Sequence, residues 1–218
     1  MGKRFDLLVF DWDGTLLDSI RAIVNAVKAS CRDLGQPEPS DMHARQVIGL
    51  GLADVLSHSV PGLAEDQFPK MIERYRFHYL STDHELNLFD GAADLIAKLH
   101  SEGFLLAVAT GKSRNGLNRA LIHCGLGRYF SATRCADECF SKPHPQMLEE
   151  LMDELSVPPE RTLMIGDTTH DLQMAINAGT SGLAVAYGAH SADLLDSLKP
   201  LGRLHSIGEL AAWLDVHA

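Results

Sequence analysis

The segment Phe5-Asp6-Leu7-Leu8-Val9-Phe10-Asp11-Trp12-Asp13-Gly14-Thr15 decides how this chain is interpreted. The nearly continuous apolar run at residues 5–10 is typical of a strand buried on both faces of a parallel sheet. Asp11 and Asp13 follow it, and residues two apart on an extended chain point to the same side. Such sheets bind ligands past the carboxyl ends of their strands, and paired carboxylates there favour a hard cation such as Mg²⁺. An Asx turn that simply ends the strand is the alternative.

Three more apolar runs predict further buried strands, at residues 104–109, 163–165 and 182–186, and a weaker run predicts one at 129–133. Between them, apolar residues recur at the spacing of one helix face, as in Ala92, Leu95, Ile96 and Leu99. Strands that alternate with helices are typical of an α/β fold with a doubly wound parallel sheet. We therefore predict a Rossmann-like core.

About 85 residues separate the first two predicted strands, far more than a crossover needs. Apolar residues spaced by three or four predict a long helix after Ser19, and residues 69–80 also have a helical pattern. Residues 36–40 form a predicted turn, with Ser40 or Asp41 as the cap of the next helix. The sequence thus predicts an inserted all-helical cap domain at residues 17–84. Residues 1–16 and 85–218 would form the catalytic core.

The composition is that of a globular protein, with 218 residues, 45% of them hydrophobic and 22% charged. A formal net charge of −10 disfavours nucleic acid and anionic membrane surfaces as partners. The four cysteines are too few and too irregular for a disulfide framework, and the spacing of Cys135 and Cys139 does not complete a zinc site. The longest uncharged stretch has 13 residues, short of the roughly 20 that span a bilayer. A cytoplasmic location is expected.

The strand at residues 163–165 also ends in acids, since Gly166-Asp167-Thr168-Thr169-His170-Asp171 follows it. Asp167 is expected at the edge of the sheet and Asp171 one turn into the next helix, on its near side. Taken alone, Asp167 could be a helix N-cap. Two acidic strand ends in one sheet favour a shared metal ion.

Two further segments have the chemistry of an anion site. Thr110-Gly111-Lys112-Ser113 follows a strand and precedes a predicted helix, where a hydroxyl and backbone N–H groups can cradle an anion. It lacks the early glycine of a phosphate-binding P-loop, and Lys112 is predicted to be a solvated surface charge. Lys142 lies in Ser141-Lys142-Pro143-His144-Pro145, whose prolines stiffen the backbone that presents it. A prolyl turn with an incidental lysine is the alternative.

Together, in their order along the chain, these segments resemble the four motifs of the haloacid dehalogenase-like hydrolases, in particular the phosphoglycolate-phosphatase-like phosphatases with a helical cap. Asp11-x-Asp13-Gly14-Thr15-Leu16 is similar to the first motif and Thr110-Gly111 to the second. Lys142-Pro143-x-Pro145 is similar to the third and Gly166-Asp167-Thr168-x-x-Asp171 to the fourth. The resemblance covers the whole chain, including the insertion after the first motif.

The resemblance implies that Asp11 is the nucleophile and becomes an aspartyl phosphate, with Asp13 as general acid and then base. It also implies a Mg²⁺ ion held by Asp11, the backbone carbonyl of Asp13, and Asp167, with Asp171 supporting this set. The presence of Asp13 favours phosphate esters over the dehalogenase and phosphonate-cleaving branches, which lack the second acid.

Three residues would hold and neutralise the phosphate. The resemblance implies that Lys142 balances the charge of the dianion and that Thr110 and Gly111 hold its oxygens. In the cap, Arg45 and Gly49 are candidate substrate contacts, although Arg45 could equally be a solvated helix end.

The expected partner is a small phosphorylated metabolite, and neither nucleic acid nor a membrane. A phosphosugar mutase is the first alternative and a phospho-accepting regulatory domain the second, although the long insertion and Asp13 speak against the latter. The sequence leaves the substrate and the oligomeric state open.

Overall fold

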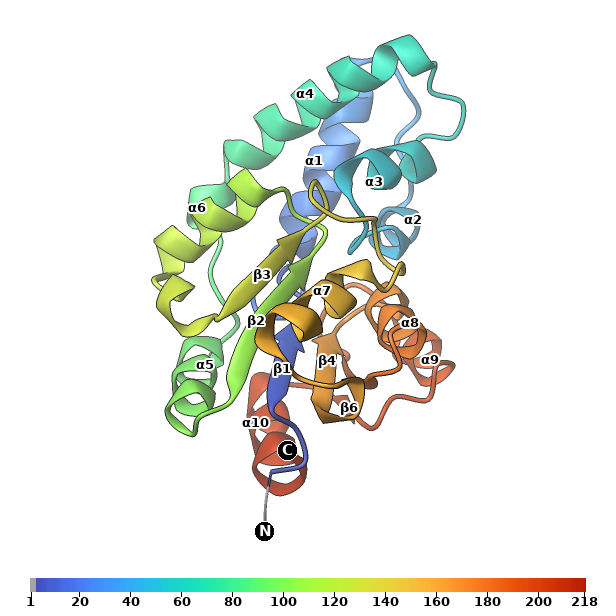
Figure 1. Cartoon of the computed structure of the whole chain (residues 1–218). Helices are drawn as coiled ribbons and strands as arrows, with labels where there is room; N and C mark the ends of the chain where they lie inside the picture. Colours follow the sequence, from blue (N-terminus) through green and yellow to red (C-terminus); the bar gives the residue numbers. More distant parts are fainter. Residues whose placement is uncertain (1–2) are drawn as a thin grey trace.

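A six-stranded, entirely parallel sheet forms the centre of the molecule in the computed structural model, which describes residues 3–218 (Figure 1). Its strands lie in the order β3-β2-β1-β4-β5-β6. Their bounds are β1 Leu7–Phe10, β2 Leu105–Thr110, β3 Ala132–Cys135, β4 Thr162–Gly166, β5 Ser181–Val185 and β6 Arg203–Leu204. The order runs outward in both directions from β1, so the structure confirms the predicted doubly wound α/β sheet.

The position of β1 in the middle of the sheet explains its apolar sequence. Val9 pairs with Ala107 of β2 and with Met164 of β4, and all four residues of β1 are buried. Alternate side chains enter opposite layers of the core: Leu8 and Phe10 pack on one face, and Leu7 and Val9 on the other.

Helices cover both faces of the sheet. Helices α5 (Ala92–Ser101), α6 (Arg114–Cys124) and α10 (Ile207–His217) pack on the first face, and α7 (Gln146–Leu155) and α8 (Thr169–Asn177) on the second. The short α9 (Ala192–Asp196) packs beside α8. Four 3₁₀ turns complete the chain, at Glu65–Gln67, Asp83–Glu85, Gly127–Tyr129 and Pro159–Arg161. No helix within residues 3–218 combines the length and apolar character needed to cross a bilayer.

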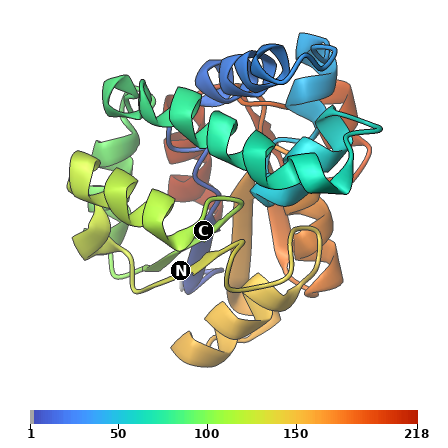
Figure 2. The ribbon, with the colours of Figure 1, turned by 90° about the horizontal axis from the view of Figure 1, so that it is seen from above.

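The cap stands over the carboxyl ends of the strands (Figures 1 and 2). It consists of α1 (Ile20–Asp33), α2 (Asp41–Gln46), α3 (Leu52–Ser59) and α4 (Phe68–Leu80), with α1 packed along α4. Leu17 forms an isolated bridge with Leu88, so the segment that leads into the cap and the segment that returns from it lie side by side. The structure confirms an inserted helical cap; the division at residues 17–84 stays a prediction.

Two serines before cap helices have different roles. The Ser40 side chain accepts a hydrogen bond from the His43 backbone N–H and caps α2, as the sequence predicts. Ser19 precedes α1 but makes no side-chain capping bond; its hydroxyl donates to Asp13 Oδ1 at 2.5 Å instead. Serine is typical of a helix start, but the Ser19 hydroxyl contacts an acid of the pair after β1 instead.

The edges of the sheet differ from the prediction. The strand expected at residues 129–133 is wrong in position, because Tyr129 ends a 3₁₀ turn and β3 begins at Ala132. Tyr129 and Phe130 pack against the core beside the sheet, so their apolar character reflects packing and not strand pairing. Strand β6 has only two residues and carries no periodicity that a sequence could reveal.

Candidate active site

The carboxyl end of β1 places Asp11 and Asp13 directly beneath the cap. Asp11 is 1% exposed and Asp13 8%. The Asp11 backbone N–H donates to the Ile165 carbonyl of β4, which continues the sheet pairing one residue past the strand. Asp11 Oδ1 lies 2.8 Å from the Lys142 ammonium, while Asp11 Oδ2 is buried with no hydrogen-bond partner in the described chain. A buried carboxylate oxygen with no partner indicates a position meant for a cation or for reaction.

Lys142 is fully buried between two acids, so the motif that carries it is not an incidental turn. Its Nζ donates to Asp171 Oδ1 at 2.6 Å as well as contacting Asp11. Burial alone lowers the pKa of Lys142, but the charges of Asp11 and Asp171 outweigh it and raise the pKa above its usual range. Lys142 therefore stays charged at the base of the site.

The start of α8 explains how Asp171 is held. Thr168 and Asp171 form a capping box, in which the Asp171 backbone N–H donates to Thr168 Oγ1. Asp171 Oδ2 accepts from the Thr168 backbone N–H at 3.0 Å and from the Thr168 hydroxyl at 2.7 Å. The N-cap of α8 is therefore Thr168 and not Asp167, which was the alternative to a metal ligand there. The Asp171 carboxylate accepts its hydrogen bonds from Thr168 and Lys142.

Asp167 is buried directly after β4, and its carboxylate accepts hydrogen bonds from two groups. Thr15 Oγ1 donates to Asp167 Oδ1 at 2.9 Å, and the Ala189 backbone N–H donates to Oδ2 at 2.7 Å. A Cβ at Gly188 would lie 2.1 Å from Asp167 Oδ2, so only glycine lets the backbone after β5 approach this closely. Burial, and then the charge of Asp171, raises the pKa of Asp167 to about 7 against these hydrogen bonds.

Asp11, Asp167 and Asp171 form a group whose carboxylate oxygens lie within 4.8 Å of one another. Burial raises the pKa of Asp11 well above its usual value; Lys142 opposes this rise, and Asp171 and Asp167 add to it. One lysine cannot balance three buried carboxylates, so the group has an excess of negative charge. A buried, oxygen-only donor set of this kind fits a hard divalent cation such as Mg²⁺, and the group can bind a metal ion.

Asp13 lies outside this group and has a different set of contacts. Its Oδ1 accepts from the Ser19 hydroxyl and lies 3.0 Å from Lys112 Nζ, while no residue within 3–218 donates to its Oδ2. Lys112 also donates to the Tyr79 hydroxyl of α4 at 2.8 Å, and its side chain is only 10% exposed. The prediction that Lys112 is a solvated charge is therefore wrong, because the carboxylate and the cap together enclose it.

The last residue of β2 is Thr110, and Gly111 begins the turn after it, so both lie at the strand end next to these acids. Thr110 is fully buried, and its Oγ1 accepts from the Lys112 backbone N–H at 3.2 Å. A Cβ at Gly111 would lie 2.3 Å from the carbonyl oxygen of Leu50, so the cap loop rests on this turn. Asp11, Asp13, Thr110 and Gly111 line one cavity of about 660 Å³ beneath the cap.

The cap residues named from the sequence differ in position. Gly49 lines the cavity beneath the cap, the candidate catalytic cavity. Arg45 is not among the lining residues; its guanidinium Nη1 donates to the Gly188 carbonyl at 3.3 Å and so joins α2 to the core. The Gly51 backbone N–H makes a second contact between cap and core by donating to Ser141 Oγ at 3.0 Å, next to Lys142 in the sequence.

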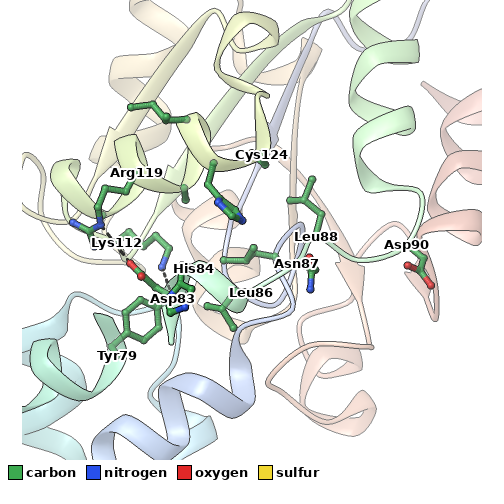
Figure 3. A pocket seen from close by; sticks show the side chains of 15 residues that line it. Tyr79, Asp83, His84, Leu86, Asn87, Leu88, Asp90, Lys112, Arg119 and Cys124 are labelled. Atoms are coloured by element: carbon green, nitrogen blue, oxygen red, sulfur yellow. Dashed lines mark hydrogen bonds and ion pairs between the residues drawn. The ribbon is translucent and has the colours of Figure 1, made fainter. Parts of the chain in front are cut away.

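A second cavity, of about 750 Å³, lies beside the two chain segments that connect cap and core (Figure 3). Figure 3 shows Lys112 joined to Tyr79 and Arg119 joined to Asp83 along its wall. Tyr79, Lys112 and Arg119 also line the cavity beneath the cap, so these three side chains stand between the two cavities.

Sequence reasoning missed several of the residues that complete the site. Thr168 could have been found, because Thr-x-x-Asp is the spacing of a capping box. Thr15 and Ser19 follow the acid pair within a few residues, so their hydroxyls could also have been predicted to bond a carboxylate of the site. Gly188 and Ala189 follow β5 with no acid or motif beside them, so only the fold brings them to Asp167.

The fold and the site together define a class: an α/β protein with a doubly wound parallel sheet, a helical cap and a buried, carboxylate-rich centre at the carboxyl edge of that sheet. A model of the family described as "Haloacid dehalogenase-like hydrolase" matches residues 8–185. The chain belongs to this family of haloacid dehalogenase-like hydrolases.

Individual relatives agree with this assignment. The chain is 35% identical over 200 residues to "Probable phosphatase IndB" of Dickeya dadantii, covering 89% of this chain and 86% of that protein. It is 33% identical over 197 residues to "Tyrosine-protein kinase PtkA" of Mycobacterium tuberculosis, covering 89% and 67%. It is 31% identical over 222 residues to "Phosphoglycolate phosphatase" of Vibrio parahaemolyticus, covering 97% of both. A crystal structure of a predicted phosphoglycolate phosphatase from Haemophilus somnus covers 100% of both chains at 23% identity with a TM-score of 0.88, which supports the fold.

Proposed function

We propose that the chain is a Mg²⁺-dependent phosphatase that hydrolyses a small-molecule phosphate monoester through an aspartyl phosphate at Asp11. The observation that carries this proposal is the state of Asp11: a fully buried carboxylate, 2.8 Å from a buried ammonium, whose second oxygen has no partner. Such an oxygen is free to attack phosphorus. Names of relatives add support, and phosphoglycolate is the first substrate to test on their account.

The residues divide the chemistry between them. Asp11 attacks the phosphorus, and Lys142 offsets the charge of the approaching phosphate. Thr110 and the amide groups of the Gly111 turn bind its oxygens, which fixes the phosphate in line with Asp11. When bound by Asp11, the backbone carbonyl of Asp13, and Asp167, Mg²⁺ would supply further charge neutralisation.

Asp13 then serves as the proton carrier. Oδ1 is held by Ser19 and Lys112, which leaves Oδ2 to protonate the leaving alkoxide and later to accept a proton from the attacking water. Asp171 positions Lys142 by accepting from it, and Thr168 holds Asp171 in turn.

The test is substitution at the two acids. Asp11→Asn should abolish phosphate release and keep the melting temperature within a few degrees, whereas Asp41→Asn, at an exposed position, should change neither. With p-nitrophenyl phosphate, whose leaving group needs no proton, Asp13→Asn should accumulate phosphorylated Asp11, read as homoserine at position 11 after borohydride reduction and peptide mass analysis. Retained turnover in Asp11→Asn refutes the mechanism.

The two alternatives give different products. A phosphosugar mutase would return the phosphate to another hydroxyl of the sugar, so free phosphate would not accumulate. A phospho-accepting regulatory domain would keep a long-lived phosphoryl group on wild-type Asp11. Continuous release of inorganic phosphate, lost with chelator and restored with Mg²⁺, distinguishes the phosphatase from both.

A further inference from the structure

The space above the nucleophile is much larger than a two-carbon acid requires. The catalytic cavity has a volume of about 660 Å³, within the roughly 300–1,000 Å³ typical of sites that enclose ring-sized organic ligands. The phosphate occupies its floor at Asp11 and Thr110 if the proposed function holds. The rest of the volume lies beneath the cap and is left for the alcohol part of the ester.

The cap wall of this cavity is apolar. Helix α3 contributes Leu52 and Val55, helix α4 contributes Ile72, and Ile23 and Ile48 come from α1 and the loop before α3. These side chains are continuous with the hydrophobic clusters inside the cap, so they are held in place. A rigid apolar wall favours an apolar ligand surface through the area it removes from water.

Two tyrosines of α4 extend this wall. The rings of Tyr75 and Tyr79 stack at a centroid distance of 5.8 Å and an interplanar angle of 12°, and both residues line the cavity. Burial raises the pKa of both hydroxyls far above the usual value, so both remain neutral phenols. The pair provides an aromatic surface whose own hydroxyls are neutral, with the Lys112 ammonium 4.7 Å from the centroid of the Tyr79 ring, and a ring-shaped ligand can pack on such a surface.

The charges around the cavity do not favour a second anionic group. Lys112 is paired with Asp13, and Arg119 with Asp83. Arg76 is exposed, and Asp54, a lining acid, has no ion pair among the described residues. A carboxylate under the cap would lose its water among apolar side chains, and the enclosed cation of the cavity, Lys112, is already paired with Asp13, so this burial is costly.

We infer that the substrate is a phosphate monoester of an alcohol whose body is apolar and about the size of a ring, and not a two-carbon acid such as phosphoglycolate. This inference rests on the proposed phosphatase function and adds the chemistry of the leaving group to it. The cap wall selects the alcohol, and the acids at the strand ends act on the phosphate.

The experiment compares three primary alkyl phosphates, so that the basicity of the leaving group varies little: 2-phenylethyl phosphate, ethyl phosphate and phosphoglycolate. Released phosphate is measured with Mg²⁺, and p-nitrophenyl phosphate serves as a general substrate. We expect kcat/KM for 2-phenylethyl phosphate to exceed that for phosphoglycolate and for ethyl phosphate by at least about tenfold, the scale on which apolar pockets discriminate.

A pair of variants tests the cap wall itself. Leu52→Arg places a cation at a half-buried lining position, where the long stem can still pack. It should shift the ratio of kcat/KM values toward phosphoglycolate by at least about fivefold. Met42→Arg adds the same charge to α2 at a position that is 71% exposed and outside the lining, and should leave the ratio unchanged.

The outcomes separate this inference from the function beneath it. No phosphate release from any of the four esters overturns the phosphatase itself. Release from p-nitrophenyl phosphate together with equal or better turnover of phosphoglycolate than of 2-phenylethyl phosphate overturns the inference alone. If Leu52→Arg does not fold, the wild-type comparison still decides.

Discussion

The contact of Lys112 with Asp13 leads to a prediction about leaving groups. Replacing Lys112 with Met removes an ammonium 3.0 Å from Asp13 Oδ1 and keeps most of the aliphatic stem. A hydrogen bond to a charged group contributes about 1.5–3 kcal/mol, and each 1.4 kcal/mol is about tenfold in rate. Because the Ser19 hydroxyl still holds the same oxygen, we expect the lower part of this range, a fall in kcat of about 10- to 30-fold.

The fall should depend on the substrate. An alkyl phosphate needs its leaving oxygen protonated, so a misplaced Asp13 slows it. A p-nitrophenolate ion leaves without a proton, and its kcat should fall by less than about threefold. Steady-state kinetics with both esters at saturating Mg²⁺ provide the measurement, and Lys112→Arg should recover part of the alkyl rate.

Tyr79→Phe is the matched control, since it removes the contact of Lys112 with the cap and leaves its contact with Asp13. It should affect both esters alike. An equal loss with both esters in Lys112→Met, or no loss with either, would refute the role of Lys112 in placing Asp13.

Three further predictions concern stability. Folding raises the pKa of Asp167 from its ordinary 3.8 to about 7, so between these pH values the unfolded chain loses the proton that the metal-free folded chain keeps. The free energy of unfolding therefore falls as pH rises through this range, by at most about 4 kcal/mol. Melting curves with chelator should therefore shift to lower temperature from pH 5 to pH 8, and Mg²⁺ should reduce the shift; a flat profile with chelator contradicts this. Lys142→Met leaves Asp11 and Asp171 buried without their cation, and denaturant unfolding at pH 8 should show a loss of about 3–5 kcal/mol that becomes smaller at pH 5. Ser40→Ala removes the α2 cap and should cost about 1 kcal/mol in the same assay with kcat unchanged, whereas an altered kcat would point to a wider effect on the cap.

Much of this architecture could be predicted because its signals are local. Buried central strands such as β1 need continuous apolar sequence, and the acids that follow β1 and β4 stand directly at the strand ends. The α1 and α4 helices carry their own periodicity. Each of these features depends on neighbouring residues, so a single sequence contains it.

The features that were missed depend on contacts between distant segments. In the sequence Lys112 resembles any surface lysine; only the fold shows that Tyr79 of the cap and Asp13, three residues after β1, enclose it. Gly188 and Ala189 reach Asp167 only because β5 pairs with β4. The edge strand β6 is two residues long, which leaves no room for a pattern.

The bridge between Leu17 and Leu88 has a consequence for how such an enzyme diversifies. Because the insertion leaves and re-enters the core at one point, its length and helices can change without moving a single strand register. A different cap would need only that its two ends lie side by side, as Leu17 and Leu88 do here. Recognition of the organic group, in the cap, and cleavage of the ester, in the core, can therefore evolve almost separately, because only these two adjacent segments connect them.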